Sequence, residues 1–378
     1  MKRGITFVGM DTAKDSIQVA MLVPESERFI EWQERNDPRG VRRLIKRLKR
    51  EALGELRTCY EAGPCGYALQ RALVANEVSC VLVAPSLIPV KPGERIKTNR
   101  RDARHLAKSY RAGTLTEVRP PTPQEEAARD LCRCREDARA DLLRSRHRLG
   151  KMLLRRALQH PGKAWTQAHR RWLRSLVFDD TVDQAVFDDY LRAIEHAEER
   201  LADLDRRVEE LSQVEPYREP VGWLRCYRGI DTVTAMGIVT ELHGFVRFGT
   251  PRALMAYLGM VPSEHSTGEK HRRGAITKAG NSHARRLLIE ASWHYRHKPA
   301  VGVKLAARRT GQPGWVIALA DRAQIRLHKR YWRLVMHGKP HNKAITAVAR
   351  ELVGFIWATL MQRETPENVK NRGQSIAA

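Results

Sequence analysis

Three carboxylates stand at positions where a sheet would bring them together. Asp11 and Glu61 each come at the end of an apolar, β-branched run, and Asp102 opens a segment with helical character. Carboxylates from the ends of adjacent strands and from a helix can jointly hold Mg²⁺ or Mn²⁺, which favour hard oxygen ligands. Such ions can activate a nucleophile and stabilise a leaving oxygen in phosphodiester chemistry. The pattern predicts a divalent-metal site, although each acid taken alone is more often a cap or a surface residue.

A second group with chemical potential is a pair of hydroxyls in a polar loop. Ser266 and Thr267 stand directly before Gly268, and a basic run follows at 270–273. A hydroxyl beside a glycine and flanked by cations can approach a phosphate, but it needs a base or a metal to lose its proton. On these residues alone, a simple turn is the more economical interpretation.

The segments around the acids predict an α/β sheet. Strands are expected on either side of a polar turn at 12–15 and again over 56–61 and 78–84, with helices over 38–53 and 67–76. Strands that alternate with helices are typical of an α/β domain. Prolines at 120, 121 and 123 interrupt this pattern, so we expect the domain to occupy residues 1–118.

Long helices are expected over 119–215. Thr122, Pro123 and Glu125 have the residue types of an N-cap, N1 and N3, which predicts a helix that runs to about Gln159. A second helix over about 183–213 carries apolar residues at three- and four-residue steps, the pattern of a short coiled-coil seam. The seam either packs within the chain or makes residues 187–212 a dimerisation element.

The last section, residues 216–378, should be mostly α-helical. Residues 227–235 have the pattern of a helix-hairpin-helix, whose backbone N–H groups can hold a phosphate. An ordinary connection between two helices explains the same residues equally well. The six cysteines are scattered without paired C-x-x-C units, so reduced thiols are expected rather than zinc ligands.

The charge points to a polyanionic partner. The chain has 68 Lys+Arg against 43 Asp+Glu, a formal net charge of +25, and two acid-poor blocks, 133–175 and 303–343, account for 19 of it. The second block contains Trp315, Tyr331 and Trp332, which suits base stacking. A hydrophobic fraction of 42%, no signal peptide and no apolar run near 20 residues exclude disordered, secreted and membrane-spanning classes. The candidate nucleic-acid contacts in the first block are Arg144, Arg148, Lys151 and Arg155.

These motifs carry a family resemblance over nearly the whole chain. Residues 9–15, 60–63 and 96–103 resemble the motifs of the RuvC-like (RNase H-like) domain of DEDD transposases of insertion-sequence family one-ten, which includes Piv-type invertases. Segments 256–262, 266–268 and 274–281 resemble the C-terminal transposase domain of that family. One position departs from the pattern: Asn99 stands where the family usually has an acid. Its amide oxygen can still coordinate a metal but carries no charge.

The resemblance implies a RuvC-like α/β domain, a helical coiled-coil region and a mostly α-helical transposase domain. It implies a DNA recombinase that acts through a covalent phosphoserine, with Ser266 as nucleophile or Thr267 in its place. Mg²⁺ or Mn²⁺ would be held by Asp11, Glu61, Asn99 and Asp102, and Arg272, Arg273 and Lys278 would neutralise the scissile phosphate.

The partners that the resemblance implies are donor and target DNA, a bridge RNA that pairs with both, and further copies of the chain in a dimer or tetramer. The expected location is the bacterial cytoplasm, at the nucleoid. Two alternatives stay open. One is a metal-dependent nuclease that uses water as its nucleophile, and the other is a nucleic-acid-binding protein without enzymatic activity.

Overall fold

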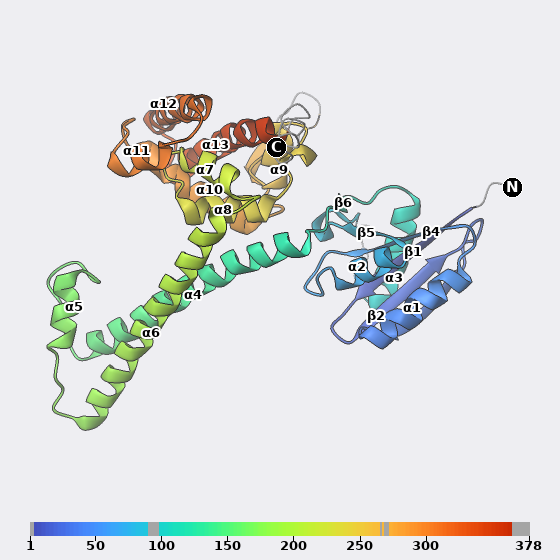
Figure 1. Cartoon of the computed structure of the whole chain (residues 1–378), viewed down its shortest axis with the longest axis horizontal. Coiled ribbons are helices and arrows are strands. Elements are labelled where there is room, and N and C mark those ends of the chain that lie inside the picture. Colours follow the sequence, from blue (N-terminus) through green and yellow to red (C-terminus); the bar gives the residue numbers. More distant parts are fainter. Residues whose placement is uncertain (1–3, 90–97, 265–266, 268–271, 365–378) are drawn as a thin grey trace, which may run out of the picture. The chain divides into compact units, whose positions relative to one another are not determined.

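The protein is described by a computed structural model that covers residues 4–89, 98–264, 267 and 272–364. The chain divides into two compact units, residues 1–121 and 122–378 (Figure 1). The boundary lies three residues from the predicted end of the α/β domain. Each unit has its own hydrophobic core, and each is described by itself below.

The first unit is built on a six-stranded mixed sheet of order β3-β2-β1-β4-β5-β6. β1 is parallel to β4, and β4 is parallel to β5, whereas the remaining neighbours are antiparallel. This arrangement is consistent with an RNase H-like domain and confirms the predicted α/β sheet. Strands β3 and β6 were not predicted. The strands are β1 (Ile5–Thr12), β2 (Ser16–Leu22), β3 (Phe29–Arg35), β4 (Glu55–Glu61), β5 (Ser79–Val83) and β6 (Glu117–Val118).

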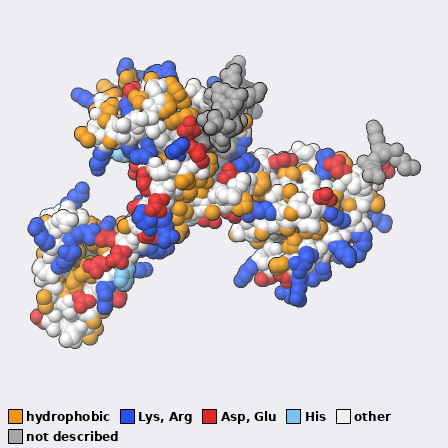
Figure 2. Space-filling view, in the orientation of Figure 1, with side chains coloured by type: hydrophobic (Ala, Val, Ile, Leu, Met, Phe, Trp, Pro, Cys, Tyr) orange, Lys and Arg blue, Asp and Glu red, His pale blue; other side chains and the backbone are white. Residues whose placement is uncertain are grey.

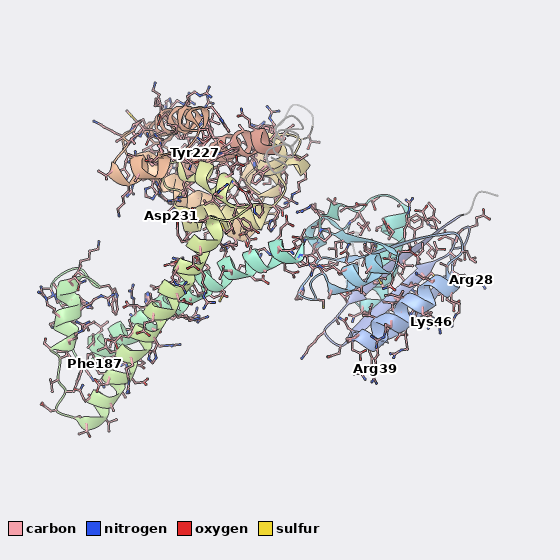
Figure 3. All side chains as sticks on the ribbon, in the orientation of Figure 1. Arg28, Arg39, Lys46, Phe187, Tyr227 and Asp231 are labelled. Carbon is pink, nitrogen blue, oxygen red and sulfur yellow. The ribbon has the colours of Figure 1, made fainter. Side chains whose placement is uncertain are left out.

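Helices α1 (Pro38–Glu51) and α2 (Ala68–Ala75) fall where they were predicted. The Asp37 carboxylate caps α1 by accepting a hydrogen bond from the backbone N–H of Gly40. Buried side chains of both helices join one face of the sheet in a common core. The other side of α1 is basic, and Figure 3 labels Arg39 and Lys46, which are both exposed. Amphipathic spacing thus gives α1 an apolar face for the sheet and a cationic face for solvent.

Helix α3 (Asn99–Arg111) packs on the opposite face of the sheet. Its Leu106 joins Cys59 of β4 and Val83 of β5 in a second, smaller core. The Thr98 hydroxyl caps the helix by accepting from the backbone N–H of Arg101. Asp102 lies in the first turn, which confirms its predicted position at the opening of a helix.

The second unit begins with two long helices, α4 (Pro123–Arg155) and α6 (Thr181–Ser212), that pack against each other with α5 (Gln167–Arg174) between them in sequence. The predicted capping box is present: the Thr122 hydroxyl accepts from the Glu125 N–H, and the Glu125 carboxylate accepts from the Thr122 N–H. Helix α4 ends at Arg155, four residues before the predicted end. We refer to α4 and α6 as the helical hairpin.

The apolar stripe of α6 is covered within the chain. Phe187, which is labelled in Figure 3, and Ile194 lie in one hydrophobic cluster with Leu142 and Leu149 of α4. Val208, near the other end of α6, joins the main core of the second unit. The packing favours the within-chain alternative for the seam and leaves this face of residues 187–212 covered by α4.

The rest of the second unit is helical apart from one short β-hairpin. Ala128 and Cys132 of α4 share its main core, so the base of the helical hairpin and the C-terminal helices form one unit rather than the separate regions 119–215 and 216–378. Its elements are α7 (Arg218–Arg225), α8 (Thr232–Leu242), α9 (Pro251–Tyr257), β7 (Pro262–Glu264), β8 (Arg273–Ile276), α10 (Ser282–Ser292), α11 (Val303–Arg309), α12 (Gly314–Met336) and α13 (His341–Glu364).

Helix α13 is the one helix in the described part of the chain that is long and apolar enough to cross a bilayer. Half of its most apolar stretch is buried inside the unit, and it contributes Ile345, Leu352 and Ile356 to the main core. It also carries Arg350 and Glu351 midway along its length. These features are those of an interior helix of a folded domain.

Candidate functional site

Asp11 and Glu61 lie at the same end of two neighbouring parallel strands. β1 and β4 pair in register from Ile5 opposite Glu55 to Met10 opposite Tyr60, so the two acids occupy the next position along each strand. Their neighbours Met10 and Tyr60 are buried in the core under α1 and α2. Because side chains alternate along a strand, Asp11 and Glu61 face the other side of the sheet, which α3 covers.

Helix α3 runs antiparallel to β1 on that face. The rings of Phe7 and Tyr110 meet edge to face at 5.4 Å, and a Cβ on Gly9 would lie 2.2 Å from the carbonyl oxygen of Ala103. From position 7 to position 11 the strand advances about 13 Å, and from position 110 back to position 102 the helix advances about 12 Å. The N-terminal turn of α3 is therefore brought to the strand end that carries Asp11.

Asp102 thus joins Asp11 and Glu61 at one end of the sheet, with Asn99 one turn earlier on the same helix. All three acids are partly buried and Asn99 is exposed. Three carboxylates and an amide are a suitable donor set for Mg²⁺ or Mn²⁺. Within the described residues, however, no three Asp, Glu, His or Cys side chains converge closely enough to ligate one ion. Ligation by all three acids would require their side chains to turn toward a common point.

A fourth carboxylate, Glu31 of β3, fastens α3 to the sheet. Arg100 Nη2 donates to Glu31 Oε2 at 2.6 Å, and Arg104 Nε donates to Glu31 Oε1 at 2.6 Å. The hydrogen bond from Arg100, together with that from Arg104, lowers the pKa of Glu31 to about 2. Because both arginines lie in the first half of α3, this ion cluster holds the end of the helix that carries Asp102. Glu31 was not among the predicted site residues, since β3 itself was not predicted.

The candidate nucleophiles belong to the segment that connects β7 and β8. Ser266 lies outside the described residues, and Thr267 is exposed. Of the cations proposed to neutralise a phosphate, Arg272, Arg273 and Lys278 are all exposed, and Arg273 Nε lies 3.5 Å from a Glu264 carboxylate oxygen across the β-hairpin. The described residues therefore place a hydroxyl and three cations on one short stretch of surface chain.

Two glycines fix the chain that follows this β-hairpin. A Cβ on Gly259 would lie 2.3 Å from the carbonyl oxygen of Ala279, and a Cβ on Gly280 would lie 1.8 Å from that of Tyr257. Both glycines have positive φ, as does Lys278 at +57°. Positive φ is strained for a lysine, and such strain persists only where surrounding contacts impose it. The segment is thereby held tightly on the end of α9, and the Lys278 backbone N–H donates to the Gly259 carbonyl oxygen at 3.0 Å.

Asn281 connects the same segment to the helical hairpin through a buried carboxylate. Its Nδ2 donates to Glu241 Oε2 at 2.6 Å, and Arg133 of α4 donates to both Glu241 oxygens at 2.7 and 3.0 Å. Burial would raise the pKa of Glu241, but these charged and neutral donors outweigh burial and lower it. The signal that could have found Glu241 is that it is the lone charge in an otherwise apolar helix, α8.

The structure favours an ordinary helix connection for residues 227–235. α7 and α8 are joined through Gly229, which has φ +83° and packs against the end of α10. The Asp231 carboxylate accepts from the backbone N–H of Thr234 and so occupies the N-terminus of α8, where a phosphate would otherwise bind. Tyr227 is buried, and its hydroxyl contacts that of Thr359 at 2.6 Å.

Acids of α6 neutralise part of the first basic block. Figure 2 shows Asp and Glu side chains among the Lys and Arg of the helical hairpin. Of the candidate contacts, Arg144 pairs with Asp141, whereas Arg148, Lys151 and Arg155 are exposed and make no ion pair within the described residues. The block itself is poor in acids, but a neighbouring helix supplies acidic partners for part of it. The pairs are Arg135–Asp205, Arg146–Glu198, Arg156–Asp183 and Arg170–Glu198.

The aromatic residues of the second basic block differ in exposure, because Tyr331 is buried whereas Trp315 and Trp332 are exposed. Trp315 meets Trp223 edge to face at 5.1 Å, Tyr331 is buried, and the Trp332 Nε1–H donates to the carbonyl oxygen of Arg296 at 3.0 Å. Each ring is thus engaged in a contact within the unit. Tyr331 is therefore inaccessible to a base, whereas Trp315 and Trp332 each keep an exposed part.

Comparison with known proteins agrees with this order of domains. A family model described as "Transposase", of the DEDD type, matches residues 8–156, and one described as "Transposase IS116/IS110/IS902 family" matches residues 223–304. With a mixed α/β unit followed by a helical unit, these matches define a transposase, an enzyme that cleaves and transfers DNA. The chain belongs to the IS116/IS110/IS902 family, the family one-ten of the sequence analysis.

Full-length relatives support the assignment. The "Putative transposase y4qE" of Sinorhizobium fredii is 41% identical over 93% of this chain and 87% of the relative. The transposase for insertion sequence element IS1533 of Leptospira borgpetersenii is 38% identical over 88% of this chain and 97% of the relative. The transposase for insertion sequence element IS1111A of Coxiella burnetii is 24% identical over 96% of this chain and 92% of the relative. The similarity therefore spans both units.

Proposed function

We propose that this transposase cuts and rejoins DNA through a covalent protein–DNA intermediate, with Ser266 as the nucleophile and Thr267 as the alternative. The single observation that carries the proposal is the antiparallel packing of α3 on β1, which brings Asp102 to the strand ends that hold Asp11 and Glu61. An acidic site on so basic a chain is expected where phosphodiester chemistry needs a bound cation.

The oxygen donors of Asp11, Glu61, Asn99 and Asp102 would hold Mg²⁺ or Mn²⁺ at this end of the sheet. When bound, such ions offset the negative charge that develops on a phosphodiester during transfer. The family's DEDD-type domain supports this role. The chain's own contribution is to position the donors, through the Gly9 contact with α3 and the Glu31 ion cluster.

The proposed strand transfer takes place in two steps. First, the hydroxyl oxygen bonds to the scissile phosphorus while the bond from phosphorus to one deoxyribose oxygen breaks. The hydroxyl proton passes to a base, and the leaving oxygen takes up a proton. Second, a deoxyribose hydroxyl of the recombining strand gives its proton to a base and attacks the same phosphorus, while the bond from phosphorus to the protein oxygen breaks and that oxygen takes up a proton. Arg272, Arg273 and Lys278 would offset the phosphate charge in both steps.

A covalent-adduct assay tests the nucleophile. Labelled DNA carrying the element ends is incubated with the full chain and Mg²⁺, and protein–DNA adducts are trapped in denaturant. We expect Ser266→Ala to abolish the adduct and Ser263→Ala, a hydroxyl in the same β-hairpin, to leave it unchanged. Adducts that persist undiminished in both Ser266→Ala and Thr267→Ala would exclude the hydroxyl mechanism.

A metal-dependent nuclease that uses water is the second candidate, favoured by the RNase H-like order of the sheet. It predicts DNA cleavage without any adduct, and cleavage that is lost in Asp11→Asn and Glu61→Gln but kept in Ser266→Ala and Thr267→Ala. The same set of variants therefore separates the two candidates.

We further propose that a bridge RNA selects donor and target DNA by base pairing, while the protein, as a dimer or tetramer, holds backbone and shape. The exposed cations of the second unit support contact with nucleic acid. Purification of the protein from cells that contain the whole element, followed by sequencing of bound RNA, should recover one structured transcript from the element. Recovery of random cellular RNA would contradict guidance, and sedimentation of the complex measures the number of subunits.

A further inference from the structure

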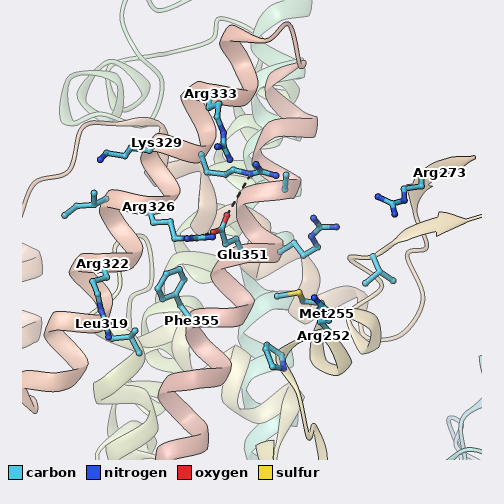
Figure 4. Close-up of a pocket in the computed structure, with 16 residues that line it drawn as sticks. Arg252, Met255, Arg273, Leu319, Arg322, Arg326, Lys329, Arg333, Glu351 and Phe355 are labelled. Atoms are coloured by element: carbon cyan, nitrogen blue, oxygen red, sulfur yellow. Dashed lines mark hydrogen bonds and ion pairs between the residues drawn. The ribbon is translucent and has the colours of Figure 1, made fainter. Parts of the chain in front are cut away.

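An open groove of about 1540 Å³ lies in the second unit, between α12 and α13 on one side and α9 and β8 on the other (Figure 4). Pockets for small molecules usually hold about 300–1,000 Å³, so this groove exceeds what such a ligand fills. Apolar side chains, among them Met255, Leu319 and Phe355, contribute to its lining. The remaining lining is dominated by cations.

Helix α12 forms most of the cationic wall. Five cations on one face of the helix line the groove, and the opposite face is buried in the core. Figure 4 shows several of them along α12, beside the groove. Their positions run from 322 to 333, a rise of about 16 Å along the helix. They are Arg322, Arg326, Lys329, Arg330 and Arg333.

Three further cations come from other elements: Arg252 of α9, Arg273 of β8 and Arg350 of α13. Among the described residues that line the groove, Glu351 is the one carboxylate beside these eight cations. Glu351 pairs with Arg326, and its other oxygen lies 4.0 Å from Arg330 Nε.

Most of this charge has no acidic partner. Within the described part of the chain, Arg252, Arg322, Lys329, Arg333 and Arg350 form no ion pair with a carboxylate. This contrasts with the helical hairpin, where α6 supplies acids to the basic block of α4. Cations held together without counter-charge repel one another, and a bound polyanion removes that repulsion.

The groove is built for phosphates rather than bases. Among the described residues, Phe355 is the one aromatic residue that lines the groove, and no Asn or Gln lines it to read a base edge. Trp315, Tyr331 and Trp332 do not line the groove. Charge without stacking platforms or amide side chains is the composition expected of a surface that follows a sugar–phosphate backbone.

We propose that this groove holds the phosphodiester backbone of a nucleic acid and recognises charge and spacing, independently of base sequence. One strand of B-DNA presents a phosphate about every 3.4 Å of axis, so about five phosphates fall within the 16 Å of the α12 wall. DNA and RNA share this chemistry. The inference rests on the proposed function only in that the partner is a nucleic acid.

Two charge-matched double variants test the groove. Lys329→Gln with Arg333→Gln removes two groove cations, and Lys339→Gln with Lys343→Gln removes two exposed cations of the same unit that do not line the groove. The affinity of each protein for a short duplex DNA of arbitrary sequence, and separately for a single-stranded RNA of equal length, is measured by fluorescence anisotropy between about 50 and 200 mM salt.

We expect the groove variant to bind roughly tenfold more weakly and its slope of log K against log salt to fall by about 1.8 for duplex DNA, or about 1.4 for RNA. The control variant should change affinity by less than about twofold. A loss with one probe only identifies whether DNA or RNA occupies the groove. Equal losses in the two double variants would overturn the proposal, because the binding would then depend on diffuse charge.

Glu351→Gln gives a test of opposite sign. Removing the one groove carboxylate should raise affinity about two- to fivefold, since the groove gains a positive charge and Arg326 is released from its ion pair. Unchanged or weaker binding by a folded Glu351→Gln protein would contradict the proposal. The covalent-adduct assay, run at saturating protein and low salt, separates the groove proposal from the proposed function. If the groove variants bind nucleic acid like the wild-type protein and adducts still form, the groove proposal is rejected and the proposed function stands.

Discussion

Gly9 of β1 lies directly against the backbone of Ala103 in α3: a Cβ on this glycine would be 2.2 Å from the Ala103 carbonyl oxygen and 2.5 Å from the amide nitrogen of Ala107. Since the obstacle is helix backbone, no change of side-chain rotamer could relieve the collision. The close approach of strand and helix sets where Asp102 stands relative to Asp11. The metal-site proposal therefore depends on a residue that has no side chain.

Gly9→Ala should displace α3 from the sheet. We expect a loss of about 1–3 kcal/mol in the free energy of unfolding, together with reduced strand transfer at temperatures where the protein is still folded. Urea denaturation followed by circular dichroism measures the first effect. Gly63→Ala is the matched control, because the nearest atom to its new Cβ would be the Glu61 carbonyl oxygen at 3.8 Å. Equal denaturation midpoints for the two variants would show that the contact between Gly9 and α3 does not limit the stability of the unit.

Local patterns predicted much of the first unit. The strands that carry Asp11 and Glu61, and the helix that starts before Asp102, follow from hydrophobic periodicity and capping residues, which are properties of neighbouring positions. The approach of the three acids was expected only in general terms. Its cause, the bare backbone at Gly9 beneath Ala103, involves positions more than ninety residues apart and has no local signature.

The arrangement of charged side chains was harder to predict than the positions of the strands and helices. The block at 133–175 contains few acids of its own, but Asp205 and Glu198 reach it from α6, because the two helices pack against each other. The groove cations on α12 could have been found from their shared helical face. Arg252 and Arg273 could not, since they come from elements that only the tertiary fold brings beside α12.

Glu31→Gln should make stability less dependent on pH. The folded-state pKa of Glu31 is about 2, below the ordinary value of 4.5, so its carboxylate stabilises the fold above about pH 4.5 and this contribution is lost as the pH falls toward 2. We expect the wild-type protein to exceed Glu31→Gln by about 1–2 kcal/mol near pH 7 and by almost nothing near pH 2. Urea denaturation across this range provides the measurement.

The matched control for that experiment is Glu27→Gln. Glu27 pairs at 2.7 Å with Arg111, which lies in α3 like the two arginines that bind Glu31. The Glu27 side chain is 75% exposed, whereas the Glu31 side chain is 11% exposed. Exposed ion pairs contribute little, so this variant should unfold like the wild-type protein. A pH-independent difference between wild type and Glu31→Gln would mean that shape, rather than charge, accounts for the contribution of Glu31.

Glu241→Gln should weaken the connection between the helical hairpin and the segment after β8. The Glu241 side chain is 2% exposed, and its loss of charge removes the ionic partner of Arg133 and alters the acceptor of Asn281. We expect Glu241→Gln to lower the free energy of unfolding by about 2–3 kcal/mol. Glu290→Gln, which breaks an exposed ion pair on α10, should lower it by less than about 0.5 kcal/mol. A double-mutant cycle with Arg133→Gln checks the coupling, and additive losses would show that the two side chains act independently.

Lys278 allows backbone strain and charge to be separated. Its φ of +57° costs about 1 kcal/mol for a residue with a Cβ, so Lys278→Gly should raise the melting temperature while Lys278→Ala should not. Both variants lose the ammonium group, so we expect the same loss of DNA affinity in each. If Lys278→Gly keeps wild-type affinity in the same anisotropy assay, the positive φ serves the packing of the segment and the ammonium contacts no phosphate.

Asn99→Asp should raise the affinity for Mg²⁺ or Mn²⁺. Asn99 is the first residue of α3, one turn before Asp102, and its replacement by Asp keeps the shape while adding a negative charge to the donor set. More ligand charge strengthens the binding of hard cations, and the helix N-terminus also favours an acid there, so we expect about three- to tenfold tighter Mn²⁺ binding by isothermal titration calorimetry. Asn76→Asp, at the C-terminal end of α2, adds the same charge to the same unit away from α3 and should leave the affinity unchanged. Equal affinities for the two variants would remove Asn99 from the set of ligands and leave the three acids as the site.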